Sequence, residues 1–154
     1  METNRVRRSR SRRVDTKYAK EEDRRMKQLS AEVERLAYRV IGAGIEVHQI
    51  LGPGFLEEVY HKALREEFLI RKIPHKSEHP VKVNYKGRPV GEGRLDFLVG
   101  DCLIVELKAV QSLTPIHEAQ VLSYLRMTKY PLALLMNFNA PLLKEGTRRI
   151  ILSS

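Results

Sequence analysis

Two carboxylates and a lysine are the residues of this sequence whose types and spacing best suit chemistry. They lie in Arg94-Leu95-Asp96-Phe97-Leu98-Val99 and Ile104-Val105-Glu106-Leu107-Lys108. Alternate residues of a strand share a face, so Glu106 and Lys108 project together while Val105 and Leu107 point the other way. Asp96 lies on the preceding strand of the same predicted hairpin, and we expect it to converge on them.

Carboxylates that meet at the end of an apolar sheet need compensation, because burying an unpaired carboxylate is costly. A bound Mg²⁺ would provide this compensation, because it takes oxygen ligands, typically one or two carboxylates and several waters. Mn²⁺ is an alternative. We therefore expect Asp96 and Glu106 to bind the cation and Lys108 to orient a water that the cation activates. A structural salt bridge between Lys108 and either acid is the competing interpretation, which the short motif alone would favour.

The length of 154 residues suits one domain. The single cysteine, Cys102, cannot form an internal disulfide, so we expect a small buried side chain rather than a reactive thiol. No apolar run approaches the roughly 20 residues of a membrane span, and the N-terminus lacks the apolar region of a secretory signal. We expect a soluble cytoplasmic protein without a membrane partner.

The net charge of +9 is concentrated at the N-terminus. Residues 1–29 contain 11 Lys or Arg and 5 Asp or Glu, whereas residues 30–154 contain 17 and 14. Few apolar side chains occur in residues 1–29, so we expect a basic, mostly disordered tail before one folded domain over residues 30–154. Such a tail attracts nucleic acid, although charge runs are often only solvated leaders.

Hydrophobic periodicity predicts a first helix over about residues 31–51, capped by Ser30, and a second from about Leu56 to Arg71. The second helix should bury one face, formed by Leu56, Val59, Tyr60, Ala63, Leu64 and Phe68. The loop Gly52-Pro53-Gly54 separates the two helices.

The period then changes to that of strands. Strands are expected over residues 81–85, near Val90, and over Leu95–Val99, Leu103–Lys108, Leu132–Phe138 and Arg148–Leu152, with a tight turn at Gly100-Asp101. A third helix is expected from about Pro115 to Lys129. The order α-α-β-β-β-β-α-β-β predicts an α/β fold with a mixed sheet flanked by helices.

Several motifs in this chain occur together in a fixed order. One reads Gly54-Phe55-Leu56-Glu57-Glu58-Val59-Tyr60; the others are Ile45-Glu46-Val47-His48, Gly52-Pro53-Gly54, Arg94-Leu95-Asp96, Val105-Glu106-Leu107-Lys108, His117 with Gln120, Ser123-Tyr124-Leu125, and Met136-Asn137-Phe138. Over about residues 32–152 the sequence thereby resembles the small bacterial GxxExxY family, which is assigned to the PD-(D/E)xK nuclease superfamily.

The resemblance implies a restriction-endonuclease-like fold with its acidic site on the central hairpin. It implies Asp96 and Glu106 as metal ligands, joined by the backbone carbonyl of Leu107, and Lys108 as the water-orienting residue. Glu57 looks like the additional helix-borne acid of many such nucleases. Its place in the first turn of the second helix also suits simple interaction with the helix dipole.

The third helix carries further candidates on one face. Gln120 and Tyr124 resemble the QxxxY helix of RecB-type nucleases, where the pair supports the site and touches the nucleic-acid backbone. His117 lies on the same face, with functional and structural roles both open. For His48 we expect a structural role, and for Tyr60 core packing with a free hydroxyl.

The function that we expect is Mg²⁺-dependent cleavage of phosphodiester bonds in DNA, with RNA less favoured. The alternatives are a non-catalytic nucleic-acid-binding module on the same fold and a regulatory or interaction protein. The chain shows no dedicated recognition domain, so target choice would come from a homodimer or a partner protein.

Overall fold

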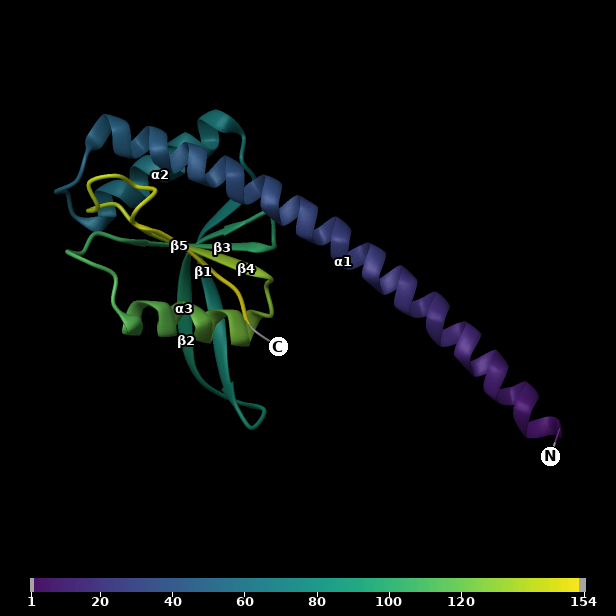
Figure 1. Cartoon of the computed structure of the whole chain (residues 1–154). Helices are drawn as coiled ribbons and strands as arrows, with labels where there is room; N and C mark the ends of the chain where they lie inside the picture. Colours follow the sequence, from purple (N-terminus) through teal and green to yellow (C-terminus); the bar gives the residue numbers. More distant parts are fainter. Residues whose placement is uncertain (1, 153–154) are drawn as a thin grey trace. The chain divides into compact units, whose positions relative to one another are not determined.

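A computed structural model gives the backbone of residues 2–152 and the side chains of residues 15–152 (Figure 1). The helices are α1 (Glu2–Leu51), α2 (Glu57–Arg71) and α3 (Pro115–Thr128). The strands are β1 (His75–Tyr85), β2 (Arg88–Val99), β3 (Leu103–Lys108), β4 (Leu132–Asn137) and β5 (Thr147–Ile150).

The strands form one mixed sheet in the order β1-β2-β3-β4-β5. The pairs β1–β2, β2–β3 and β4–β5 are antiparallel, and β3–β4 is parallel because α3 crosses between them. The predicted α/β fold with a mixed sheet is confirmed.

The predicted element order is wrong in one place, because the strand near Val90 and the strand Leu95–Val99 are a single strand, β2. Gly91 and Gly93 interrupt the apolar pattern that marks a strand. This stretch is mostly exposed and pairs with β1 throughout, so it does not need apolar side chains.

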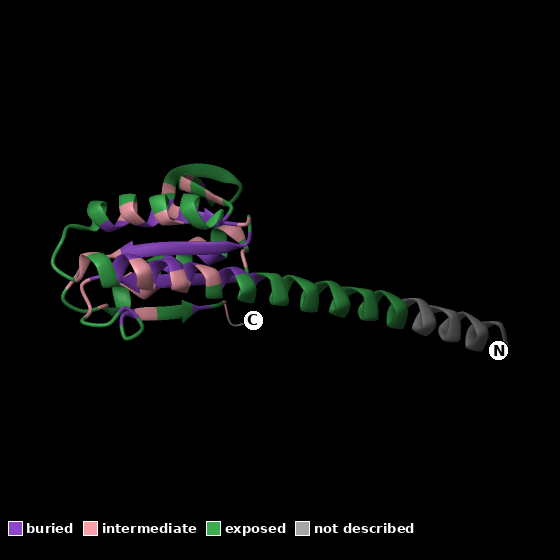
Figure 2. Cartoon of the chain, turned by 90° about the horizontal axis from the view of Figure 1, so that it is seen from above, coloured by how far each residue is buried: buried purple, intermediate pink, exposed green. Residues whose placement is uncertain are grey.

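Helices cover both faces of the sheet (Figure 1). On one face, buried residues of α1 and α2 pack with Val105 and Leu107 of β3. On the other face, Val121 of α3 packs with Ile104. Strand β4 is buried at all six positions, as its continuous apolar run predicts. Figure 2 shows buried strand and helix surfaces facing each other inside the domain, with exposed residues on the outside.

Helix α1 begins at Glu2, so the prediction that Ser30 caps a helix starting at residue 31 is wrong. The backbone of residues 2–29, expected to be mostly disordered, is helical; the side chains of residues 2–14 lie outside the described residues. Arg, Lys and Glu are strong helix formers, and Asp23 pairs with Lys27 one turn later at 3.2 Å. By its internal contacts the chain divides into two units, Met1–Glu32 and Val33–Ser154.

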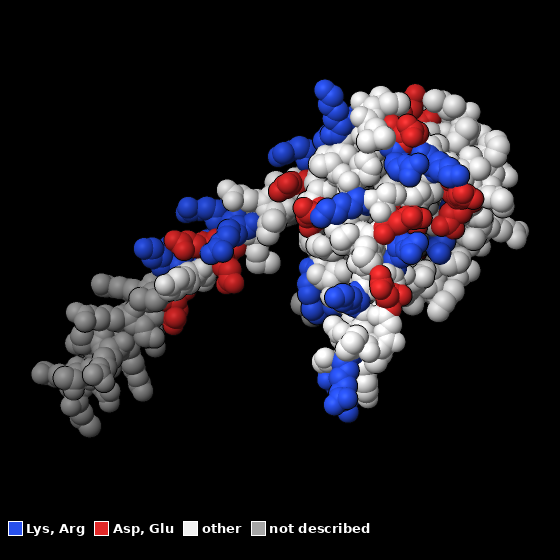
Figure 3. Space-filling view, turned by 180° about the vertical axis from the view of Figure 1, so that it is seen from behind, with Lys and Arg blue, Asp and Glu red and all other residues white. Residues whose placement is uncertain are grey.

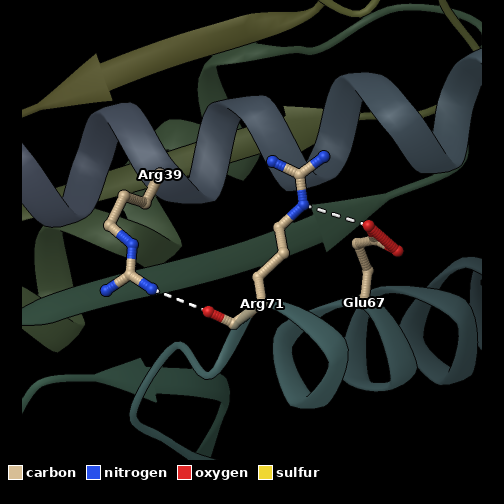
Figure 4. Close-up of polar contacts among 3 residues, drawn as sticks. All are labelled: Arg39, Glu67 and Arg71. Carbon is tan, nitrogen blue, oxygen red and sulfur yellow. Dashed lines mark hydrogen bonds and ion pairs between the residues drawn. The ribbon is translucent and has the colours of Figure 1, made fainter.

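Arg39 connects α1 with the end of α2 (Figure 4). Nη2 of Arg39 donates to the carbonyl oxygens of Arg71 (2.8 Å) and Lys72 (3.4 Å). Nε of Arg71 donates to Oε1 of Glu67 at 3.0 Å. The last carbonyls of a helix have no partner inside it, so Arg39 satisfies two of them from the neighbouring helix.

The buried face of α2 is smaller than predicted. Tyr60, Leu64 and Phe68 are buried, but Leu56 is the N-cap and is 80% exposed, and Val59 is 38% exposed. Elsewhere Cys102 is buried and forms no disulfide, as expected. No described helix combines the length and the apolar character that a membrane crossing requires.

Candidate active site

The site forms where β2 and β3 stop pairing. Backbone pairs join Phe97–Val99 to Leu103–Val105, and the next residues are Asp96 and Glu106. Here side-chain oxygens replace backbone carbonyls as acceptors. The amide of Asp96 donates to Glu106 Oε1 (3.0 Å), and the amide of Leu107 donates to Asp96 Oδ2 (2.8 Å). Both carboxylates are thereby held between the diverging strands, as predicted.

The alternation of side chains along β2 changes at Asp96. Leu95 packs in the cluster with α3, whereas Phe97 packs in the cluster with α1 and α2. Residues two apart in a regular strand share a face. Opposite on β1, Glu78 has a left-handed φ of 53° and lies between the pairs Ser77↔Phe97 and His79↔Leu95. The Asp96 side chain, at this change in alternation, bonds toward β3, where its Oδ2 accepts from the amide of Leu107.

Glu106 and Lys108 share a face of β3, as the alternation predicts. Val105 and Leu107 are buried against α1 and α2, while Nζ of Lys108 reaches Oε1 of Gln120 on α3 at 3.4 Å. Among the described residues, no ion pair joins Lys108 to either carboxylate. The competing interpretation, a structural salt bridge, is therefore not what the structure contains.

Helix α2 brings two more polar side chains to Asp96. Glu57 and His61 are one turn apart and lie on the same side of the helix. Nε2 of His61 lies 3.3 Å from the carbonyl oxygen of Asp96, and its ring stacks on Phe97 with centroids 4.4 Å apart. Glu57, His61 and Asp96 contribute to the wall of an open pocket of about 540 Å³, which Glu58, Lys62, Arg65 and Glu78 complete.

The loop before α2 fixes where Glu57 lies. Gly54 has a φ of 114°, a conformation that glycine adopts without strain. The buried Tyr60 donates its hydroxyl to the carbonyl of Gly52 (2.6 Å) and accepts from the amide of Phe55 (3.1 Å). The expectation that this hydroxyl is free is wrong, because the loop wraps around it. Gly54, Glu57 and Tyr60 thus form one local unit.

Burial and mutual repulsion shape the electrostatics of the acids. Burial and then the negative charge of Asp96 raise the pKa of Glu106 to about 9, against the opposing effects of the Asp96 amide and Lys108. Partial burial, followed by Asp96, also raises the pKa of Glu57, while Lys108 and His61 act in the opposite direction. A positive charge among these acids would favour their ionised forms.

The donor set fits a hard divalent cation. Asp96 and Glu106 offer carboxylate oxygens from two adjacent strands, and Mg²⁺ uses one or two carboxylates together with waters. Leu107, whose carbonyl is the third predicted ligand, lies between Glu106 and Lys108 on the same strand. Over the described part of the chain, no group of three or more His, Cys, Asp or Glu side chains is arranged to hold a metal ion.

Three other candidates have contacts away from the carboxylates. The ring of Tyr124 lies against Gly93, where an added Cβ would come within 2.6 Å of Cε1. His117 accepts from the amide of Thr114 (3.0 Å) as part of a capping box. His48 contacts the carbonyl of Ala140 through Nε2 (2.8 Å), the structural role that we expect for it.

Two residues that support the site were not predicted from the sequence. His61 is absent from the predicted site, although its spacing of four from Glu57 places both on one helical face. Asn137 belongs to a motif but had no role: its amide group accepts from the amide of Val110 (3.1 Å) and donates to the carbonyl of Val110 (2.9 Å). These bonds hold the chain just after Lys108.

Comparison with known proteins identifies the superfamily. Residues 34–150 match the family model of the PD-(D/E)XK nuclease superfamily, and that range contains every side chain of the site. No curated protein and no solved structure gives a significant match. Because the family model covers most of its length, the chain belongs to the PD-(D/E)XK nuclease superfamily.

Proposed function

We propose that this protein is a metal-dependent nuclease that hydrolyses phosphodiester bonds of DNA, with RNA as the less favoured substrate. The main support is the pair of hydrogen bonds that holds Asp96 and Glu106 side by side where the strands diverge. In this proposal the two carboxylates bind Mg²⁺ or Mn²⁺, with the carbonyl of Leu107 as a further ligand.

The bound cation would acidify a water and stabilise the negative charge that grows on the phosphate. Lys108 orients this water, and Gln120 positions Lys108 through the contact at 3.4 Å. Glu57, on the pocket wall with Asp96, takes part in moving the proton of the water. Tyr124, packed on Gly93 three residues before Asp96 in β2, would contact the substrate at a distance from the carboxylates.

We also place the chain in the GxxExxY group of the superfamily. The support is that Gly54, Glu57 and Tyr60 form one structural unit, in which the glycine and the tyrosine shape the loop that presents the glutamate. We place its action in the cytoplasm, where a lone thiol such as that of Cys102 stays reduced. A second copy or a partner protein would select the target.

The proposal is tested by cleavage assays on single-stranded, double-stranded and branched DNA and on RNA, across divalent metals. We expect activity with Mg²⁺ or Mn²⁺ and none with a chelator. Asp96→Asn, Glu106→Gln and Lys108→Met should each lower the cleavage rate about 100-fold or more while circular dichroism stays unchanged. Glu57→Gln should lower the rate by a smaller factor.

Matched controls remove the same charges elsewhere. Asp101→Asn, Lys144→Met and Glu66→Gln alter exposed residues outside the site and should leave the rate unchanged. Full activity in the Asp96 and Lys108 variants would refute the proposed site. Metal-dependent nucleic-acid binding by the wild-type protein without any cleavage would instead indicate a binding module. Absence of metal affinity in isothermal titration would indicate a regulatory protein.

A further inference from the structure

The outer half of the β1–β2 hairpin, residues 82–91, extends beyond the rest of the sheet (Figure 1); we call it the hairpin arm. Strands β1 and β2 pair from His75↔Val99 to Tyr85↔Arg88, but β3 pairs with β2 only over Phe97–Val99. From residue 84 to residue 92 every side chain is exposed. Within the described residues the arm is therefore a two-stranded ribbon open on both faces.

The hairpin arm is basic: residues 82–91 contain no acid, and the nearest acid, Glu92, lies opposite Lys82 in the strand register. The arm carries Lys82, Lys86 and Arg88, and Figure 3 shows basic side chains at the end of this projection. Residues 30–154 contain 17 basic and 14 acidic residues, so the three arm residues equal the whole basic excess. In the part of the chain that the structure describes, no ion pair joins any of the three to a carboxylate.

The arm leads directly into the candidate active site along β2. Eight residues separate Arg88 from Asp96, and at about 3.4 Å per residue this is at most about 27 Å. One turn of DNA is about 34 Å long. A duplex with one phosphate at the site would therefore meet the arm within a single helical turn.

From this placement we infer that the hairpin arm enters the major groove of double-stranded DNA, which makes duplex DNA the substrate. The inference rests on the proposed nuclease function, because the site determines where the duplex lies. The major groove is about 12 Å wide and admits a two-stranded ribbon. The three cations of the arm then contact phosphates on the groove walls.

The composition of the arm supports a duplex over a single strand. Proteins that bind single strands offer aromatic side chains on which successive bases stack. The arm has one aromatic residue, Tyr85, and the ammonium of Lys86 lies 5.5 Å from its ring centroid. A role in preventing edge-to-edge pairing of sheets would also favour charged residues here. Lysine is especially common in that role, and the two roles differ in what removal of the charges would change: affinity for duplex DNA or the association of the protein with itself.

The test compares nucleic-acid binding by the full chain and by the triple variant Lys82→Thr, Lys86→Asn, Arg88→Thr. Threonine suits strands, and asparagine tolerates the left-handed φ of 48° at position 86. Fluorescence anisotropy in Ca²⁺ would use a DNA duplex of about two turns, the matching single strand and an RNA duplex. Ca²⁺ allows binding to be measured apart from cleavage.

We expect the triple variant to bind the DNA duplex about tenfold more weakly, with the salt slope lowered by about 0.9 for each phosphate that the arm no longer neutralises. Binding to the single strand and to the RNA duplex should change less than about twofold, since the major groove of RNA is too deep and narrow for side chains to read. A control variant, Arg35→Ala, Arg126→Ala, Lys144→Ala, removes three exposed charges outside the arm and should bind like the wild type.

Two results would overturn the inference. One is unchanged affinity for the DNA duplex; the other is an equal decrease in affinity for all three nucleic acids, which would indicate a general polyanion surface. Failure of the nuclease proposal gives a different pattern: arm-dependent binding of duplex DNA without cleavage by the wild-type protein in Mg²⁺ or Mn²⁺.

Discussion

Glu106 combines deep burial with a neighbouring negative charge, and this should make the stability of the metal-free protein depend on pH. The pKa of Glu106 is about 9 in the folded protein, against an ordinary value of 4.5 for an exposed glutamate. Between these values the folded state binds more protons than the unfolded chain, so the free energy of unfolding should fall as the pH rises. Glu106→Gln, which cannot ionise, should flatten this dependence.

Urea unfolding in a chelator between about pH 5 and about pH 9 measures the effect. Asp101→Asn serves as a control that removes an exposed carboxylate and should keep the wild-type slope. Added Mg²⁺ should stabilise the wild-type protein most at the alkaline end, where the cation favours the ionised carboxylates. The same slope in Glu106→Gln as in the wild type would show that Glu106 does not cause the dependence.

The residues of the site differ in how far the sequence could predict them. The shared face of Glu106 and Lys108 follows from the period of a strand alone. The orientation of Asp96 does not, because the regular alternation of side chains breaks between Leu95 and Phe97, which pack in different clusters. The hydrogen bonds of the Tyr60 hydroxyl could not be predicted from the sequence either, because they depend on a loop that closes around the side chain.

At the scale of elements, the attachment of α1 to α2 matters because α2 carries Glu57 and His61. Arg39→Ala removes the donor to the two terminal carbonyls of α2 and should lower the free energy of unfolding by about 1 kcal/mol. Arg35→Ala, one turn earlier and exposed, should change it by less than about 0.5 kcal/mol. Urea titration of both variants makes the comparison, and equal values would argue against this attachment.

The type of an element could be predicted where burial determines the hydrophobic pattern of its residues. The boundaries of an element could not be predicted where its residues are exposed. The apolar run of β4 identified a strand with a covered face on each side. In β2, by contrast, the exposed stretch around Gly91 and Gly93 suggested a break, although pairing with β1 continues through it. At Gly93 the ring of Tyr124 occupies the space of a side chain, a contact between distant segments that the local sequence does not reveal.

At the scale of the whole molecule, positive charge is held in two elements with different consequences for binding. The hairpin arm has a fixed ribbon geometry, so its contribution should depend on the form of the nucleic acid. Residues 1–29, with 11 basic and 5 acidic residues, should attract any polyanion through charge alone. The two contributions should therefore separate when single strands and duplexes are compared.

Deletion of residues 1–29 tests this separation. All side chains from residue 15 to residue 32 are exposed, and the shortened helix would begin at Ser30, a good N-cap, with Glu32 in its first turn. The melting temperature should therefore change by less than about 3 °C. Affinity for single-stranded and double-stranded DNA should fall by similar factors at low salt, and the difference from the full chain should vanish near 1 M salt, where charges are screened within about 3 Å. A decrease in affinity for the duplex alone would mean that the N-terminal residues recognise its shape. A large fall in melting temperature would mean that they belong to the folded unit.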